Sequence, residues 1–585
     1  MHIIKKLHIS PYELALLTFV AGASLLRFLL ISANWPVTNS DEATMGLMAQ
    51  HIAYNGELPT FFYGQYYMGP MEAYIGAVLF HLFGSSTFTF RLGLLLLFAL
   101  FLVTLYYLIS LLYSKKFALA MVALFSLGSN DIILHQLKGI GGYPELVFLA
   151  TLILLLVGHL SLSSSREATG SQRWHRLLLY ALLGIAMGFT LWTDQLILPI
   201  LATGGLTLLL FCRKELFRCG GLCLLLGFVI GAFPMILYNV TAPYGQTSFN
   251  ALLDVQHSGT DKLAAMHLPL LHQLIGSLMV ALPSITGANP ICIPDPLPPL
   301  TLGTAQTYAC FAGEGIWSLG FLLLSCIAAL LSIPTLWTYW RQSRRAAPKE
   351  EPLDRREVVL QFNRLMLLAG ALLTLAAYTI SAASALYPGT TSRYLICVQV
   401  GLSAVLWPLW NGVKTLKWPW VAPSPGWTKI FFFSRVAVLL LIATTFVMGT
   451  IRIIPMIADA QRFQRQGDTL IQHLESVGAT HIYSDYWTCN RIIFQSNERI
   501  ICAVLSEKLR TGQDRYAPYP ATVKADPHAA YAFAIEPIAG ASYVTGVEQN
   551  TTFTRQILPN SGAQFKKYVF AGYVVYQPVS ATGSP

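Results

Sequence analysis

Two adjacent carboxylates, Asp41 and Glu42, follow an apolar run that is long enough to cross a bilayer and contains one charge, Arg27. Carboxylates at a membrane face are costly unless water, a cation or a reaction needs them. The pair is therefore a candidate for acid–base chemistry, in which one carboxylate takes a proton from a substrate. The alternative is structural, because Asn39 or Ser40 can cap a helix whose positive end favours two acids.

Three further segments carry candidate residues. Glu145 begins a later apolar run, where it either stabilises the helix start or binds a polar group. Arg393, followed by Tyr394, is the lone basic residue of its loop, and a guanidinium there suits a phosphate or reaches lipid headgroups. Tyr66 and Tyr67 belong to an aromatic, turn-rich stretch, which predicts an interfacial belt or the wall of a site for an amphiphilic substrate.

The composition shows which elements must position these residues. Of the 585 residues, 54% are hydrophobic and only 11% are charged, whereas soluble proteins carry about 25% charged residues. The chain is therefore predicted to be an α-helical polytopic membrane protein with about eleven spanning helices. They are expected near residues 10–32, 86–112, 117–134, 145–162, 177–193, 195–212, 219–238, 316–338, 363–385, 394–411 and 430–450.

The positive charge indicates orientation in a membrane. The formal charge of +10 does not point to nucleic acid, because the basic residues form short clusters between apolar runs. Those clusters fall almost entirely in the loops of one side, and the opposite side receives only Lys138, Lys262 and Arg393. This asymmetry predicts a cytoplasmic N-terminus, with the first run as a retained signal anchor, in the plasma membrane. Asp41 and everything after Arg452 then lie outside the cytoplasm.

Two segments outside the membrane have a predicted structure. The first outer loop, residues 33–85, contains two short amphipathic segments, 43–54 and 70–83, which are expected to lie as helices in the membrane interface. The tail is more polar and shows strand-like runs at 481–483, 499–505 and 568–570 after a helical stretch at about 456–476. The domains are therefore predicted as a transmembrane domain, 1–450, and a small extracytoplasmic α/β domain, 451–585.

The cysteines agree with this topology. Cys292 and Cys310 share one outer loop, and Cys489 and Cys502 share the tail, so each pair is either a disulfide or two free thiols. The sequence shows no CxxC motif or His/Cys cluster for a structural metal and no particular cofactor, and it leaves a divalent cation open.

Taken in order, these features resemble those of the lipid-linked-sugar membrane glycosyltransferases with the GT-C fold. The closest branches are the protein O-mannosyltransferases and the bacterial aminoarabinose transferases. The resemblance covers roughly residues 10–450 and rests on the order and membrane side of the motifs together. The motifs are Asp41-Glu42, Tyr67-Met68-Gly69-Pro70, Leu82-Phe83-Gly84, Arg91-Leu92, Gly141-Gly142-Tyr143-Pro144-Glu145, Ser392-Arg393-Tyr394-Leu395 and, in the tail, Tyr483-Ser484-Asp485-Tyr486-Trp487.

The resemblance implies that a sugar moves from a polyprenyl-phosphate donor to a hydroxyl of a protein, lipid or glycan, with inversion. Asp41 would be the catalytic base, Glu42 would orient the acceptor or support the helix start, and Glu145 would bind a sugar or acceptor hydroxyl. Arg393 would neutralise the leaving phosphate, and Arg27 could reach the same group or form a buried pair. Tyr66, Tyr67, Tyr394 and Lys138 complete the expected substrate-binding set.

One position departs from the family. Relatives often have Lys-Pro where this chain has Gly69-Pro70, so aminoarabinose specificity is not carried over. Two other classes of function remain open. A transporter or lipid flippase would use the same charges as a pathway, although the sequence shows no internal repeat. A scaffold would carry the acids without chemistry.

Overall fold

The computed structural model describes residues 10–164, 170–288, 305–343, 354–415, 426–536, 543–560 and 564–579. Its contacts divide the chain into two compact units. Unit 1 consists of Met1–Leu25, Leu97–Gln136 and Tyr143–Arg452, and unit 2 consists of Leu26–Leu96, Leu137–Gly142 and Ile453–Pro585. Unit 2 therefore unites the tail with the first outer loop, whereas the sequence-based division at residue 450 separates the two.

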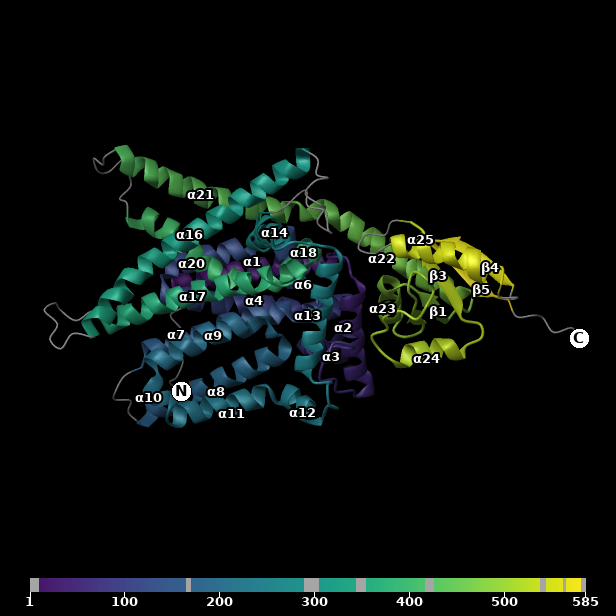
Figure 1. The fold of residues 1–585 in the computed structure, drawn as a ribbon, viewed down its shortest axis with the longest axis horizontal. Helices are drawn as coiled ribbons and strands as arrows, with labels where there is room; N and C mark the ends of the chain where they lie inside the picture. The colour runs from purple at the N-terminus through teal and green to yellow at the C-terminus, as the bar shows by residue number, and fades with distance from the viewer. Residues whose placement is uncertain are drawn as a thin grey trace, which may run out of the picture. The chain divides into compact units, whose positions relative to one another are not determined.

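Unit 1 is built from long apolar helices that run side by side (Figure 1). In the described residues, seven helices are long and apolar enough to cross a membrane, and the number rises to eleven if four bent pairs are counted as spans. This result agrees with the predicted polytopic helical fold. The main helices are α1 (Pro11–Ser32), α4 (Thr87–Leu112), α7 (Tyr143–Leu162), α8 (Gly170–Thr193), α9 (Leu198–Phe211), α16 (Ala305–Ser343), α17 (Arg355–Thr379), α20 (Val398–Thr415) and α21 (Gly426–Ile451).

The span predicted at 117–134 is bent, because two helices form it. Helix α5 (Lys115–Ser126) and helix α6 (Asn130–Leu137) meet at an angle of 85°. The hydroxyl of Ser129 accepts a hydrogen bond from the backbone N–H of Ile132, so a new helix begins there. The break falls at Gly128, Ser129 and Asn130, three residues that favour turns and that interrupt the apolar stretch.

The Pro-rich segment between the predicted spans 219–238 and 316–338 is largely helical in the residues that the structure describes. Helix α12 (Phe233–Thr241) continues the bent pair that starts at Cys219, and α13 (Ser248–Ala265), α14 (Leu270–Gly276) and α15 (Leu282–Thr286) follow it. The segment from Ser248 to Ala265 and the segment from Leu270 to Thr286 are bent by 113° relative to each other. Residues 289–304, which include most of the prolines, lie outside the described part of the chain.

Glycines allow two helices of unit 1 to pack at very short distance. Gly184 and Gly188 on α8 face α11 (Cys219–Gly231), and a Cβ atom added at either would lie 2.1 Å from a backbone oxygen of α11. Gly227 and Gly231 on α11 face α8 in the same way, at 2.3 and 2.2 Å. Four-residue spacing of small residues on both helices is the pattern that brings membrane helices together.

Unit 2 contains a five-stranded sheet in the order β2-β1-β3-β5-β4 (Figure 1). Strands β1 (His481–Ser484), β2 (Ile501–Val504) and β3 (Ala530–Ala534) are parallel, and β5 (Tyr573–Pro578) runs antiparallel to both β3 and β4 (Phe565–Phe570). The helices of this α/β domain are α22 (Ile453–Ser476), α23 (Tyr486–Gln495), α24 (Pro518–Ala525) and α25 (Tyr543–Thr552).

This tail confirms the predicted small α/β domain. Helix α22 and strands β1, β2 and β4 coincide with predicted elements, whereas β3 and β5 were not predicted. Strand β3 has the sequence Ala-Tyr-Ala-Phe-Ala, and alanine is depleted in strands, so its propensity signal is weak.

The two predicted amphipathic segments of the first outer loop are helices with different surroundings. Helix α2 (Ser40–Gln50) is buried along almost its whole length and packs against α3 and α23 within unit 2. Helix α3 (Met71–Phe83) keeps an apolar face exposed through Val78, Leu82 and Phe83. Only α3 therefore presents the free apolar surface expected of an interfacial helix.

Candidate functional site

The acidic pair lies in the first turn of α2, where the chain changes from extended to helical conformation. Asn39 is extended, and its side-chain oxygen accepts a hydrogen bond from the backbone N–H of Glu42 at 3.1 Å. The cap and the helix dipole both favour the negative charges, as the structural interpretation of the sequence requires. The hydroxyl of Ser40 donates to the backbone oxygen of Tyr486, which fixes this turn to the tail domain.

Glu42 and Asp41 point into different environments. Glu42 is fully buried and binds Arg91 through two hydrogen bonds, from Nε to Oε1 at 2.8 Å and from Nη2 to Oε2 at 2.6 Å. Arg91 also donates to the hydroxyl of Thr38 at 3.1 Å. A buried bidentate pair of this kind stabilises the local fold only while both partners are present. Glu42 therefore has a structural partner that accounts for its charge.

Asp41 remains partly accessible and is held by two residues of the tail domain. The phenol of Tyr486 donates to Asp41 Oδ1, and Arg515 Nη2 lies 3.3 Å from the same oxygen. Arg515 Nε also donates to the Tyr486 oxygen at 2.9 Å, so each of the side chains of Asp41, Tyr486 and Arg515 contacts the other two. The Asp41 side chain keeps 19% of its surface exposed, against 7% for Arg515.

The surroundings of this triad keep Arg515 charged and Tyr486 protonated. Burial alone would lower the pKa of Arg515, but the nearby oxygens of Tyr486 and Asp41, with a smaller contribution from Tyr67, raise it. Burial, together with the charge of Asp41, raises the pKa of the Tyr486 phenol. Tyr486 can therefore act only as a donor to Asp41. The Arg515 guanidinium also lies over the ring of Phe62, 5.1 Å from its centre.

The other predicted residues of unit 2 are spread over several environments. Tyr66 is half exposed, whereas Tyr67 is partly buried and helps to raise the pKa of Arg515. Lys138 is 9% exposed, and Arg27 is fully buried in α1. The structure thus brings Tyr67 near Arg515.

A second group of predicted residues lies within unit 1. Arg393 lies beside two aromatic rings, with its guanidinium carbon 5.6 Å from the centre of Tyr143 and 5.7 Å from that of Tyr394. The rings of Tyr143 and Tyr394 are themselves stacked, with centres 6.4 Å apart. Glu145 is fully buried in the first turn of α7, two residues after Tyr143. The motif around Arg393 and the motif around Glu145 therefore meet in this unit.

Asp131 and His135, which the sequence motifs did not include, adjoin this second group. Ser392, next to Arg393, donates its hydroxyl to Asp131 at 2.9 Å. His135 Nδ1 lies 3.6 Å from Asp131, and the His135 ring lies against Tyr143. Asp131 belongs to the short helix α6, which exists only because the predicted span is broken. Because the run at 117–134 is apolar on average, the sequence did not indicate Asp131 as a site residue.

The Gly-rich segment before Glu145 is held by a buried acid of unit 2. Glu72, in the first turn of α3, accepts hydrogen bonds from the backbone N–H groups of Gly141 and Gly142 at 3.4 and 3.3 Å. The φ angles of these glycines, 134° and 87°, lie in a region that other residues rarely adopt. The sequence motif thus encodes a turn that a carboxylate fixes.

The tail contributes one disulfide to the described structure. Cys489 and Cys502 are bonded, and they connect α23 to strand β2. Cys310 is also disulfide-bonded, and Cys292 lies outside the described residues. In the described ranges, no group of three or more His, Cys, Asp or Glu side chains is arranged to hold a metal ion.

The sequence motifs indicated Asp41, Glu42, Glu145, Arg393 and Tyr394 as candidates. They indicated neither Arg515 nor the pairing of Arg91 with Glu42. Arg515 has no local signal, because it lies in an ordinary polar loop of the tail. The sequence indicated Tyr486 only as part of the motif from Tyr483 to Trp487. The neighbouring Asp485 caps α23 by accepting a hydrogen bond from the N–H of Trp487 at 2.8 Å.

Comparison with known proteins places the fold. No protein-family model matches the sequence, and no curated protein sequence matches it. The structure is similar to that of ArnT from Cupriavidus metallidurans bound to undecaprenyl phosphate, with a TM-score of 0.53 and 13% identity over 97% of this chain and 99% of that one. The apo form of the same ArnT gives a TM-score of 0.51 and 14% identity over 97% and 98% of the two chains.

The oligosaccharyltransferase AglB from Archaeoglobus fulgidus is more distant, with a TM-score of 0.45 and 13% identity over 97% of this chain and 75% of that one. Because the identity is so low, the two ArnT comparisons show a common fold and nothing more. The protein therefore has a GT-C-like membrane fold with a small C-terminal α/β domain.

Proposed function

We propose that this protein is an integral-membrane glycosyltransferase that moves a sugar from a polyprenyl-phosphate donor to an acceptor hydroxyl outside the cytoplasm. The observation that carries the proposal is the Asp41 carboxylate, which is partly exposed and fixed by Tyr486 and Arg515. The fold supports it, because ArnT, a protein of similar fold, is bound to undecaprenyl phosphate. The proposed sugar transfer requires a base near a lipid-linked phosphate.

The proposed reaction is a single displacement at the anomeric carbon of the donor sugar. The acceptor oxygen forms a bond to that carbon while the bond from the carbon to the phosphate oxygen breaks. The electron pair of the broken bond leaves with the polyprenyl phosphate, and the hydroxyl proton passes to Asp41. One displacement inverts the anomeric centre. A carboxylate within hydrogen-bond reach typically contributes about 10²–10⁴-fold to such a proton transfer.

Arg515 and Tyr486 are assigned as positioning residues for Asp41. Both bind Oδ1, and within the described residues no hydrogen bond to Oδ2 is recorded. Oδ2 is therefore the oxygen assigned to the acceptor hydroxyl. Holding a reacting group in one orientation removes entropy from the barrier before the reaction begins.

Glu42 receives a different role from Asp41. Of the two roles predicted for it, the buried pair with Arg91 supports the one that stabilises the start of α2. Glu145 and Arg393 keep the roles that the sequence motifs suggest, namely binding a sugar or acceptor hydroxyl and neutralising the leaving phosphate. For Arg393, the position of the guanidinium near the rings of Tyr143 and Tyr394 supports this role, because a guanidinium suits a phosphate.

The remaining substrate-binding assignments rest on the sequence. Tyr66, Tyr67 and Lys138 are proposed to contact donor or acceptor, and Arg27 is proposed for the donor phosphate. The acceptor class is a protein, lipid or glycan hydroxyl. For the topology we propose a cytoplasmic N-terminus and an extracytoplasmic tail, because the basic clusters follow the positive-inside pattern and the Cys489–Cys502 disulfide suits an oxidising compartment. Alkaline phosphatase fused after Val579 should then be active.

The donor is identified by reconstitution. The full chain is placed in proteoliposomes with a panel of radiolabelled polyprenyl-phosphate sugars and membrane extract as the source of acceptor. We expect the wild type to release label from one donor class and to transfer it to an acceptor. Release from no donor by an intact, folded preparation would contradict the transferase proposal and favour transport or scaffolding.

A further inference from the structure

A small polar cavity lies in unit 2 at the far end of α2 from Asp41. It has a volume of about 230 Å³, and its lining comes from the end of α2, from the segment after α3 and from the turn that follows α23. The lining residues are Gln50, Tyr54, Asn55, Ser85, Asn497 and Glu498. No element of the proposed reaction uses these side chains.

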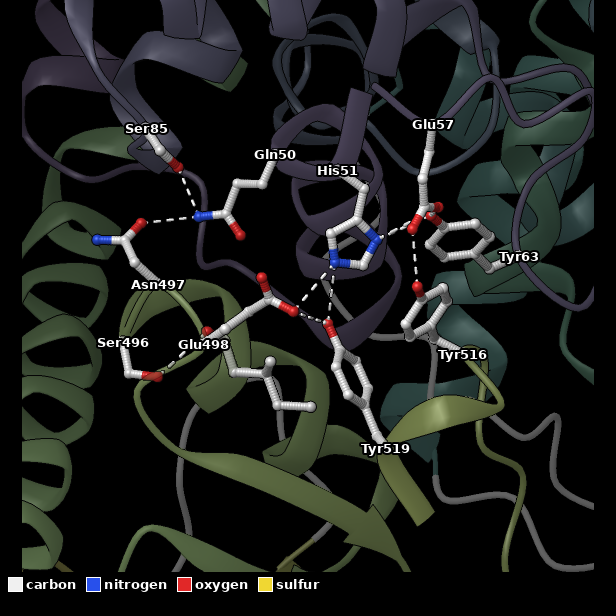
Figure 2. Close-up of polar contacts among 11 residues, drawn as sticks. Gln50, His51, Glu57, Tyr63, Ser85, Ser496, Asn497, Glu498, Tyr516 and Tyr519 are labelled. Carbon is white, nitrogen blue, oxygen red and sulfur yellow. Dashed lines mark hydrogen bonds and ion pairs between the residues drawn. The ribbon is translucent and has the colours of Figure 1, made fainter. Parts of the chain in front are cut away.

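Gln50 is the buried centre of this lining, and its amide group is only half satisfied. Its Nε2 donates to the hydroxyl oxygen of Ser85 and to Oδ1 of Asn497, both at 2.7 Å (Figure 2). Within the described residues, its Oε1 is buried and accepts no hydrogen bond, although the residue is only 4% exposed. A buried amide oxygen without a donor costs about 1–3 kcal/mol, so this atom calls for a ligand donor or a water.

The turn opposite Gln50 has an unusual backbone. Asn497 and Glu498 both have positive φ angles, of 51° and 59°, which a glutamate rarely adopts. Residues held in such conformations cost about 1–3 kcal/mol each and concentrate at binding sites. Asn497 is turned toward Gln50 and Glu498 toward His51 and Tyr519 (Figure 2), and both residues line the cavity.

Glu498 is fixed as an ionised acceptor by a buried histidine. Its Oε1 lies 3.1 Å from His51 Nε2 and accepts a hydrogen bond from Tyr519 at 2.8 Å. The other ring nitrogen of His51 lies 2.8 Å from the hydroxyl of Tyr63, and the His51 side chain is 1% exposed. The hydrogen bond from His51 lowers the pKa of Glu498, so the carboxylate is charged at neutral pH (Figure 2).

The chemistry of the lining selects the class of ligand. The lining residues carry amide groups, hydroxyls and a carboxylate, and they include no Lys or Arg. A phosphate would meet negative charge without a cation, which is unfavourable. Neighbouring hydroxyl groups, each of which both donates and accepts, match this set. Since ligand pockets usually measure about 300–1,000 Å³, this cavity admits only about one sugar ring.

Tyr54 completes the site. Its hydroxyl donates to the backbone oxygen of Phe80 at 3.1 Å, which fixes the side chain, and the residue, which is 55% exposed, lines the cavity. The negative face of an aromatic ring suits the C–H face of a pyranose. An aromatic face beside a set of amides and a carboxylate is a combination that suits a carbohydrate.

We propose that this cavity binds one neutral pyranose of a glycan, as a subsite separate from the Asp41 group. Gln50 follows Asp41 by nine residues on the same helix, which corresponds to about 14 Å along the axis and to opposite faces. The subsite therefore does not hold the reacting hydroxyl. It binds a sugar unit independently of transfer, and it goes beyond the proposed activity.

The test measures binding directly, with the full-length protein in lipid nanodiscs. Methyl glycosides of glucose, galactose, mannose and N-acetylglucosamine are titrated and observed by saturation-transfer NMR. The variants are Asn497→Gly, which keeps the positive φ accessible, and Ser85→Ala, which removes a single hydroxyl. Asn560→Ala, at an exposed position of the same unit, is the matched control. Thermal unfolding confirms that each variant is folded.

We expect at least one glycoside to bind the wild type and the control with equal affinity. Asn497→Gly should weaken binding at least tenfold, Ser85→Ala should weaken it severalfold, and added inorganic phosphate should not compete. Absence of binding by all four glycosides, unchanged binding in both variants, or displacement by phosphate would each overturn the proposal. Because transfer is not measured, these outcomes are independent of the role of Asp41.

Discussion

Arg515 Nη2 lies 3.3 Å from Oδ1 of Asp41, although 474 residues separate the two in the sequence. Only 7% of the Arg515 side chain and 19% of the Asp41 side chain remain exposed, so solvent screens the pair less than an ion pair at the surface. Within unit 2 a residue of the tail domain thus orients the candidate base in the first outer loop. The tail therefore has a part in the proposed chemistry.

Replacing Arg515 with alanine should slow transfer. Loss of the guanidinium leaves Asp41 held by Tyr486 alone, and a displacement of about 1 Å can cost on the order of 100-fold in rate. Because the residue positions another, we expect the loss in kcat, with the KM for donor changed less than threefold. Arg515→Lys should restore part of the rate, since Lys retains the charge but not the planar fork. Steady-state kinetics in proteoliposomes provide the measurement.

Arg510→Ala is the matched control for Arg515, because Arg510 is exposed in the same loop. It should leave both kinetic constants unchanged. Equal losses in Arg510→Ala and Arg515→Ala would indicate a general effect of charge in the loop and would remove the positioning role.

The local part of the fold was predictable from local signals. The order Asn39, Ser40, Asp41, Glu42 is typical of a helix start, and the structure places a capped helix there. Long apolar runs likewise predicted most helices of unit 1. The break after Ser126 was missed because the apolar average outweighed Gly128, Ser129 and Asn130, although these residues favour a turn.

Of the Asp41–Arg515 pair, only Asp41 could be predicted from the sequence. Motif order identified Asp41, but no property of one sequence connects it to Arg515, because pairing over such a separation depends on how the domains fold. The close approach of α8 and α11 is an intermediate case. The spacing of Gly184, Gly188, Gly227 and Gly231 signals packing in the sequence, but it does not reveal which helices become partners.

Breaking the Glu42–Arg91 pair should destabilise the protein more than removing it. Arg91→Met leaves an unpaired buried carboxylate and should cost about 3–5 kcal/mol. The double variant Glu42→Gln/Arg91→Met should recover part of that loss, since no charge remains buried. Thermal unfolding in detergent shows the order of stability. A double variant less stable than Arg91→Met would contradict the assignment of this pair as a coupled structural unit.

Gly188→Ala should lower the thermal unfolding temperature by several degrees. A Cβ atom at this position would lie 2.1 Å from the backbone oxygen of Phe228, so α8 and α11 must separate. Gly205→Ala on α9 is the control, because nothing lies within 4 Å of its added Cβ. The control should be neutral or more stable, since alanine is favoured over glycine in helices by about 1 kcal/mol. If both variants unfold at the same temperature, the close approach of α8 and α11 is not important for stability.

Asp514 should make the tail domain less stable as pH rises. Burial raises the pKa of its carboxyl group to about 6, from an unfolded value near 3.8. The folded state therefore binds the proton more tightly, so stability is greatest below the unfolded pKa and falls until pH passes about 6. Asp514→Asn keeps an oxygen for the N–H of Val504 and should remove this fall between pH 4 and pH 7. An identical pH dependence of unfolding in the two proteins would exclude Asp514 as its source.

The most direct test of the account is the single-turnover rate of sugar transfer with Asp41→Asn, measured together with binding of the same donor. Asp459→Asn, at an exposed position of α22, is the control. We predict a loss of at least about 100-fold for Asp41→Asn, with donor affinity within about threefold of wild type and an unaffected control. Transfer at the wild-type rate by a folded Asp41→Asn protein would show that Asp41 is not the base and would contradict the central claim.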